Sequence, residues 1–180
     1  MNEIVAVTFD PIARDGIEAA TMRKVATAAG ATTGRVTHHF SSRVDLLVAT
    51  LAEVERRRSS RIATHADLEP SARLKATLLE LLPLDTARLD EQRVWVSLCT
   101  TGIPELRDEV RHQTAQRDRV IGKLVEKIQG RQTDNAAAFS LLALVDGLAH
   151  RLMLDTTTRP RRAAMQALDN ALRSNDNGHA

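Results

Sequence analysis

Apolar residues recur along this 180-residue chain at the three- and four-residue spacing of amphipathic helices, and no run shows the sustained alternation of a half-buried strand. Glycine and proline divide this pattern into blocks, as they do where helices begin and end. Aromatic residues make up only 2% of the chain and tyrosine is absent, whereas a β-sandwich relies on aromatic and β-branched side chains. The sequence therefore predicts an all-α protein.

Charge and cysteine content limit the kinds of function to consider. The 25 basic residues nearly balance the 23 acidic ones, so nucleic-acid binding would depend on where the charges lie. A single cysteine, Cys99, excludes an internal disulfide and a cysteine-based zinc site. The longest apolar stretch, near Leu141, is too short to span a bilayer, and the N-terminus does not resemble a secretion signal. We expect a soluble cytoplasmic protein without membrane contact, metal or cofactor.

Capping residues and prolines predict where the helices begin and end. The first helix runs from Ile4 towards Gly16, and Pro11 is expected to kink it or to restart it with Asp10 as a new N-cap. The tail from Ser174 is expected to fray. The other predicted helices span 21–29, 32–39, 43–58 with an extension towards 64, 71–82, 90–100, 105–128, 134–154 and 160–173.

Residues 16–47 contain the pattern most informative about function. Thr21 is a good N-cap for one short helix, Gly30 follows the end of that helix, and Thr32 caps a second one. Two short helices joined in this way predict a helix-turn-helix, which places its second helix in the DNA major groove. Val36 and Phe40 are predicted to turn inward. The residues that then face outward are Thr33, Arg35, Thr37 and His38.

These outward side chains suit base recognition, because arginine pairs with guanine and threonine contacts the thymine methyl group. Gly34 allows close backbone approach to DNA, or simply flexibility at the start of the helix. Arg23 and Lys24 oppose the macrodipole of their helix, which is favourable beside a phosphate, but a solvated cationic face explains them as well. Adjacent histidines point about 100° apart on a helix, so no metal site is predicted.

The same segment resembles the DNA-binding domain of TetR-family transcriptional repressors. The resemblance implies a three-helix DNA-binding domain at residues 1–45 and a helical ligand-binding and dimerisation domain at residues 46–180. Thr37 stands where the family has tyrosine. The matching residues, in the order and spacing of the family, are Gly16, Thr21, Val25, Ala26, Ala29, Gly30, Ala31, Thr32, Gly34 through Phe40, Arg43, Leu46 and Leu47.

The resemblance also implies roles for individual residues. Phosphate contacts are implied for Thr21, Arg23, His39 and Arg43. Base contacts are implied for Thr33, Gly34, Arg35, Thr37 and His38. Basic and acidic side chains balance within residues 1–50, so one copy should bind double-stranded DNA weakly, and a homodimer on two half-sites is required.

The last two predicted helices carry a candidate subunit interface. Small residues on one face of the helix 134–154, next to an apolar face, permit close approach of another helix. We expect a four-helix interface between two subunits, as the resemblance also implies; the alternative is that both faces are internal core. The candidate interface residues are Ala136, Ser140, Ala143, Gly147, Ala164, Leu168 and Leu172.

Residues 94–110 and 141–154 resemble the C-terminal domain of the choline-responsive repressor subgroup. The low aromatic content argues against an aromatic cage for a quaternary ammonium ion, so choline is not carried over and the effector stays unidentified. Candidates for a ligand site among the middle helices, each equally plausible as core, are Leu78, Leu82, Trp95, Cys99 and Val120.

We therefore expect a ligand-responsive transcriptional regulator, a repressor rather than an activator, that binds a palindromic operator as a homodimer and is released by a small-molecule effector. One alternative is a ligand-independent DNA-binding protein with a solid C-terminal bundle, which a cavity would argue against. The other is an all-α enzyme with Cys99 as nucleophile and His112 or His150 as base. A lone cysteine in an apolar run is more often packed than reactive, and no phosphate loop or nucleophile elbow occurs, so no catalytic residue is predicted.

Overall fold

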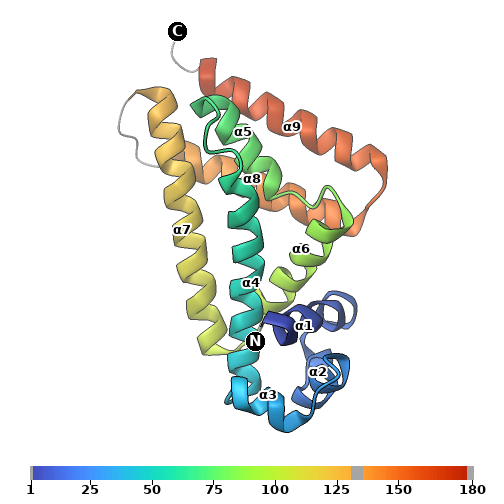
Figure 1. Ribbon diagram of the computed structural model, residues 1–180. Helices are drawn as coiled ribbons and strands as arrows, with labels where there is room; N and C mark the ends of the chain where they lie inside the picture. The colour runs from blue at the N-terminus through green and yellow to red at the C-terminus, as the bar shows by residue number, and fades with distance from the viewer. Residues whose placement is uncertain (1, 131–135, 178–180) are drawn as a thin grey trace. The chain divides into compact units, whose positions relative to one another are not determined.

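The computed structural model describes residues 2–130 and 136–177, and every secondary-structure element in those ranges is helical (Figure 1). The all-α prediction is confirmed. The elements in chain order are α1 (Asn2–Asp15), the 3-10 turn η1 (Ile17–Ala19), α2 (Met22–Ala28), α3 (Thr33–His39), α4 (Arg43–Ala63), α5 (Pro70–Glu80), α6 (Thr86–Cys99), α7 (Pro104–Gln129), α8 (Ala136–Leu154) and α9 (Thr158–Asn177).

The described residues form two compact units, each with its own apolar core. The first unit draws on Met1–Arg57 and Asp90–Gln113, and the second on Arg58–Leu89 and Thr114–Ala180. Helices α4, α6 and α7 each supply residues to both units. The sequence instead predicted a boundary between residues 45 and 46, which separates a DNA-binding domain from a ligand-binding domain. This functional boundary differs from the division into compact units and stays a prediction.

Helix α1 differs from its prediction, because it continues through Pro11 without a restart at Asp10. Proline costs a helix interior about 3 kcal/mol. Against this, α1 buries Ile4, Phe9 and Ile12 on one face, at 4% exposure or less, in the core of the first unit. Burying large apolar side chains contributes about 1.5–3 kcal/mol each, so packing outweighs the local preference.

The turn between α2 and α3 forms as predicted. The Thr21 hydroxyl accepts a hydrogen bond from Lys24 N at 3.3 Å, and the Thr32 hydroxyl accepts one from Arg35 N at 3.2 Å. Gly30 follows α2 with φ 59°, in the left-handed region that favours glycine. At the start of α4, Asp45 N donates to Ser42 Oγ at 3.1 Å.

Several helix bounds differ from the predicted ones. Helix α6 begins at Thr86 rather than residue 90, because Asp85 caps it by accepting a hydrogen bond from Arg88 N at 2.8 Å. Helix α9 spans Thr158–Asn177 rather than 160–173, so its predicted end at residue 173 is wrong, and the expected fraying from Ser174 stays a prediction. Residues 178–180 lie outside the described part of the chain. Asp134, the predicted first residue of α8, also lies outside it.

The core of the second unit lies among α5, α7, α8 and α9, and α9 packs against α8 and α5 (Figure 1). Helix α8 contributes Leu141, Val145 and Leu152, which are at most 3% exposed. Within the described ranges, α8 alone is long and apolar enough to cross a membrane, with a mean hydropathy of 1.5 over 18 residues. Core helices of soluble proteins meet the same criterion, and α8 packs one side into such a core.

Candidate nucleic-acid interface and effector cavity

Helix α3 is held by its apolar side and presents its polar side to solvent. Val36 and Phe40 are 0% and 4% exposed in the first core. The structure brings the five predicted base-contacting residues together on the exposed surface of this helix: Thr33, Gly34, Arg35, Thr37 and His38. The Thr37 hydroxyl donates to the Gly34 carbonyl at 3.1 Å, so its oxygen lone pairs are what it offers to a ligand.

The start of α2 carries two of the predicted phosphate-binding residues. Arg23 is exposed and lies one residue after Met22, which begins the helix. Thr21 uses its hydroxyl oxygen as the N-cap, which leaves the hydroxyl hydrogen for an acceptor outside the helix. First-turn backbone N–H groups and the helix dipole favour an anion at this position.

Arg43 is bound within the protein, which sequence reasoning missed. Its Nε donates to the Ala20 carbonyl at 2.9 Å, and one terminal nitrogen donates to the Ile17 carbonyl at 2.6 Å. The same nitrogen lies 3.3 Å from a carboxylate oxygen of Glu18. Arg43 therefore joins the start of α4 to the η1 turn, and its predicted phosphate contact stays untested.

Two exposed histidines end α3. The rings of His38 and His39 meet edge to face with centroids 5.5 Å apart. Desolvation, followed by the positive charges of neighbouring groups including His38 and Arg35, lowers the pKa of His39. His39 is therefore neutral near pH 7 in the free protein, and an adjacent phosphate would favour its protonated form.

The candidate interface residues separate into two groups. Ala136, Ser140, Ala143 and Gly147 are exposed along α8. In contrast, Ala164 and Leu168 of α9 are 3% and 0% exposed, and Leu172 is half-buried. These three pack inside a single copy of the chain, because they cover the core residues of α8 and α5.

Three large apolar side chains on α8 and α9 are exposed and were not predicted. Phe139 is 72% exposed and Leu154 74%, both on α8, and Met165 of α9 is 44% exposed. Phe139 and Leu154 lie on either side of Ser140, Ala143 and Gly147 in the sequence. Because α8 is apolar nearly all round, its periodicity alone could not separate this surface from its buried side.

The predicted ligand-binding residues are divided between the two units. Leu78 and Leu82 are fully buried in the second core, whereas Val120 is 45% exposed. Trp95 packs against the first core, and Cys99 is half-buried near the end of α6. None of the five lines the cavity described below, and their role stays a prediction.

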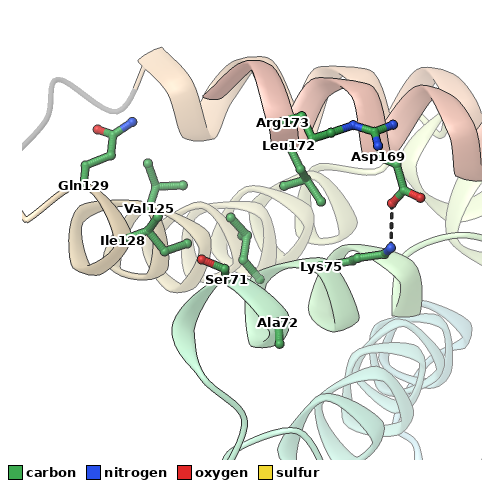
Figure 2. Close-up of a pocket in the computed structure, with 10 residues that line it drawn as sticks. Ser71, Ala72, Lys75, Val125, Ile128, Gln129, Asp169, Leu172 and Arg173 are labelled. Atoms are coloured by element: carbon green, nitrogen blue, oxygen red, sulfur yellow. Dashed lines mark ion pairs between the residues drawn. The ribbon is translucent and has the colours of Figure 1, made fainter. Parts of the chain in front are cut away.

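A cavity of about 330 Å³ opens between α5, α7 and α9 in the second unit (Figure 2). Leu74 of α5, Val125 and Ile128 of α7, and Leu172 of α9 supply its apolar wall. Figure 2 shows Lys75 of α5 reaching Asp169 of α9, with Nζ and Oδ1 2.7 Å apart. The volume is within the range of small-molecule sites, about 300–1,000 Å³.

Comparison with known sequences identifies the class of this protein. The profile of the tetR family of bacterial regulatory proteins matches residues 4–50, and the BetI-type transcriptional repressor C-terminal profile matches residues 70–175. The chain belongs to the TetR family of transcriptional regulators, with a C-terminal domain of the BetI type. The prediction of a DNA-binding transcriptional regulator is confirmed at this level.

Individual relatives agree with this assignment. The chain is 29% identical to the HTH-type transcriptional regulator PksA of Bacillus subtilis, over 93% of this chain and 87% of PksA. A transcriptional regulator from Rhodococcus sp. Rha1 superposes with a TM-score of 0.86 and 28% identity, covering 96% of this chain and 94% of that one. A regulator from Saccharomonospora viridis in complex with choline has a TM-score of 0.84 at 23% identity, with 96% and 94% coverage, and shows the shared fold.

Proposed function

We propose that this protein represses transcription in the cytoplasm as a homodimer, that α2 and α3 bind each half of a near-palindromic operator, and that a small-molecule effector releases it. The observation that carries the DNA-binding part is the two-sided character of α3. Val36 and Phe40 hold the helix to the core, while Thr33, Arg35 and His38 lie exposed on it. Sequence-specific binding through the major groove needs this arrangement.

The DNA-binding part is tested with Arg35→Ala and operator duplexes selected from a random pool. Loss of a bidentate arginine–guanine contact costs about 1–3 kcal/mol and should relax specificity at one position per half-site. Arg14→Ala is the matched control, because Arg14 is also exposed but lies in the last turn of α1 rather than on α2 or α3. Fluorescence anisotropy at fixed salt gives the affinities, and equal affinity of the wild type for selected and random duplexes refutes the proposal.

The exposed surface of α8 supports the homodimer. Small side chains at Ala143 and Gly147 let a second helix approach, and Phe139 and Leu154 would leave water on association. Gly147→Arg tests this cleanly, since a Cβ at this position meets nothing within 4 Å. The substitution also raises intrinsic helix propensity, so a folded monomer is the expected product.

Sedimentation at low micromolar concentration should show a dimer for the wild type and a monomer for Gly147→Arg. Ala52→Arg provides the control, because Ala52 is a small exposed residue on α4 that belongs to the first unit, whereas α8 and α9 belong to the second. If Gly147→Arg remains a dimer, the interface lies elsewhere.

The cavity in the second unit favours the ligand-responsive regulator over the ligand-independent alternative. The choline complex of the Saccharomonospora viridis protein shows that a protein of this fold holds a small molecule. Titrating candidate small molecules into the protein–operator complex tests release. If molecules that bind the second unit leave operator affinity unchanged, regulation by an effector fails and the ligand-independent function takes its place.

A further inference from the structure

The cavity between α5, α7 and α9 has the chemistry of a site for an amphipathic anion. Its apolar wall comes from three helices: Leu74 from α5, Val125 and Ile128 from α7, and Leu172 from α9. Leu74 and Val125 are 4% and 2% exposed, so this wall is continuous with the core of the unit. A ligand here gains from burying a hydrocarbon body.

The charges around the cavity favour a negative head group. Lys75 is paired with Asp169 at 2.7 Å, so these two lining residues compensate each other. Arg173 also lines the cavity, and it donates to the neutral amide oxygen of Asn170 at 2.8 Å. The charged side chains that line the cavity are Lys75, Asp169 and Arg173, so the lining carries a net charge of +1, and the Arg173 guanidinium has further N–H donors.

The start of α5 adds to this preference. Ser71 and Ala72 line the cavity, and they are the second and third residues of the helix. The N-cap residue, Glu69, makes no side-chain hydrogen bond to the helix end. Pro70 has no N–H, and Arg73 N donates to the Glu69 carbonyl at 2.8 Å. The first-turn N–H groups without an acceptor in the helix are therefore those of Ser71 and Ala72, the two residues that line the cavity at the positive end of the helix dipole.

The volume limits the size of the ligand. At about 30 Å³ per water-sized group, 330 Å³ corresponds to a molecule of about ten non-hydrogen atoms. A linear carboxylate of about eight carbons has this size, with its tail against Val125 and Ile128 and its head near Arg173.

We propose that this cavity is the effector site and that it takes a small linear carboxylate; the effector role rests on the proposed function above. Helix α7, which lines the cavity with Val125 and Ile128, also supplies Pro104–Gln113 to the first unit, the unit that contains α2 and α3. A ligand that prefers one position of α7 therefore biases both units through one continuous helix.

The probe for this proposal is octanoate, measured by calorimetry at pH 7 against octanamide and octylammonium, which keep the chain and change the charge. We expect octanoate to bind most tightly. Ile128→Trp fills the cavity and should abolish binding, whereas Gln116→Trp, on the exposed surface of the same helix, should not. Arg173→Gln should weaken binding roughly tenfold. Arg162→Gln is its control, since Arg162 is exposed on α9 outside the cavity lining.

Operator affinity with and without octanoate separates this inference from the proposed function. Calorimetric binding that is lost in Ile128→Trp, together with weaker operator binding by the wild type, supports the effector site. No octanoate binding, or binding unchanged in Ile128→Trp, overturns it and leaves the repressor function intact. Binding in the cavity without any change in operator affinity refutes the effector role. Absence of specific operator binding without octanoate instead refutes the proposed function, while calorimetry still reports on the cavity.

Discussion

Arg43 offers a sharp test of whether a cation beside the helix-turn-helix acts on DNA or on the fold. Its guanidinium bonds to the carbonyls of Ile17 and Ala20 and pairs with Glu18. These partners hold the start of α4 against the η1 turn that precedes α2. We expect Arg43→Met, which keeps an unbranched apolar stem and removes the guanidinium donors, to act mainly on stability.

The magnitude follows from the two carbonyl bonds. A hydrogen bond from a charged donor contributes about 1.5–3 kcal/mol. The Arg43 side chain is 32% exposed, so solvent replaces part of each bond, and about 2–3 kcal/mol for the pair is a reasonable value. The ion pair adds little, because the Glu18 side chain is 83% exposed. Urea unfolding should therefore show a loss of about 2–3 kcal/mol in Arg43→Met.

The salt dependence of operator affinity separates the two roles. Removing a phosphate contact reduces the magnitude of the slope of log K against log salt by about 1. We expect no such change for Arg43→Met under conditions where it is fully folded. Arg23→Gln is the comparison, because Arg23 is exposed at the start of α2 and its removal should lower the slope. If Arg43→Met loses less than about 0.5 kcal/mol of stability and its slope falls by about 1, the structural role is wrong and the phosphate contact stands.

Three further predictions concern pH and backbone approach. The pKa of His39 is lowered from 6.5, so His39 gains its proton, and its attraction to a phosphate, as pH falls below neutrality. Operator affinity should therefore rise by roughly fivefold between pH 7.5 and 5.5. In anisotropy titrations, His39→Gln should remove this rise and His38→Gln should retain it. Arg56 and Arg57 lower the pKa of Glu53 from 4.5 to about 2, so the ionised Glu53 stabilises the fold above pH 4.5 and this stabilisation is lost as pH falls towards 2. Glu53→Gln should lower the free energy of unfolding by about 1–2 kcal/mol at pH 7, after allowing for solvent screening. Unfolding curves in which wild type and Glu53→Gln differ as much at pH 2 as at pH 7 would contradict this. Gly34→Ala should raise stability by about 0.5–1 kcal/mol while weakening operator binding, and unchanged operator affinity would exclude close backbone approach.

Local signals in the sequence predicted the helix-turn-helix well, because capping acts over three or four residues. Thr21 and Thr32 cap the helices they were expected to cap, and Gly30 has the expected positive φ. The same local signals misplaced α1 and α6. Burial of the α1 side chains outweighs the preference of Pro11, and Asp85 supplied a cap that was overlooked in favour of a start at Asp90.

Features that depend on contacts far apart in sequence were beyond this kind of prediction. Arg43 meets carbonyls 23 and 26 residues earlier in the chain, so no local pattern distinguishes it from a phosphate-binding arginine. The cavity needs residues from α5, α7 and α9 together, and the five apolar candidates were chosen without that information. On α8, periodicity showed apolar residues all round but not which side the rest of the chain covers.

Gly34 shows how a mismatch between local preference and structure points to function. Glycine in a helix costs about 1 kcal/mol relative to alanine, so a glycine inside α3 calls for a compensating reason. The chain itself supplies none: Gly34 lacks the positive φ of Gly16 and Gly30, and an added Cβ would lie 3.8 Å from the Thr32 hydroxyl, an ordinary contact. We therefore expect the reason to lie outside the chain, on the exposed side of α3, where a methyl group would hold the backbone away from a ligand. Opposite changes in stability and operator affinity in Gly34→Ala would locate the closest approach of DNA at this residue.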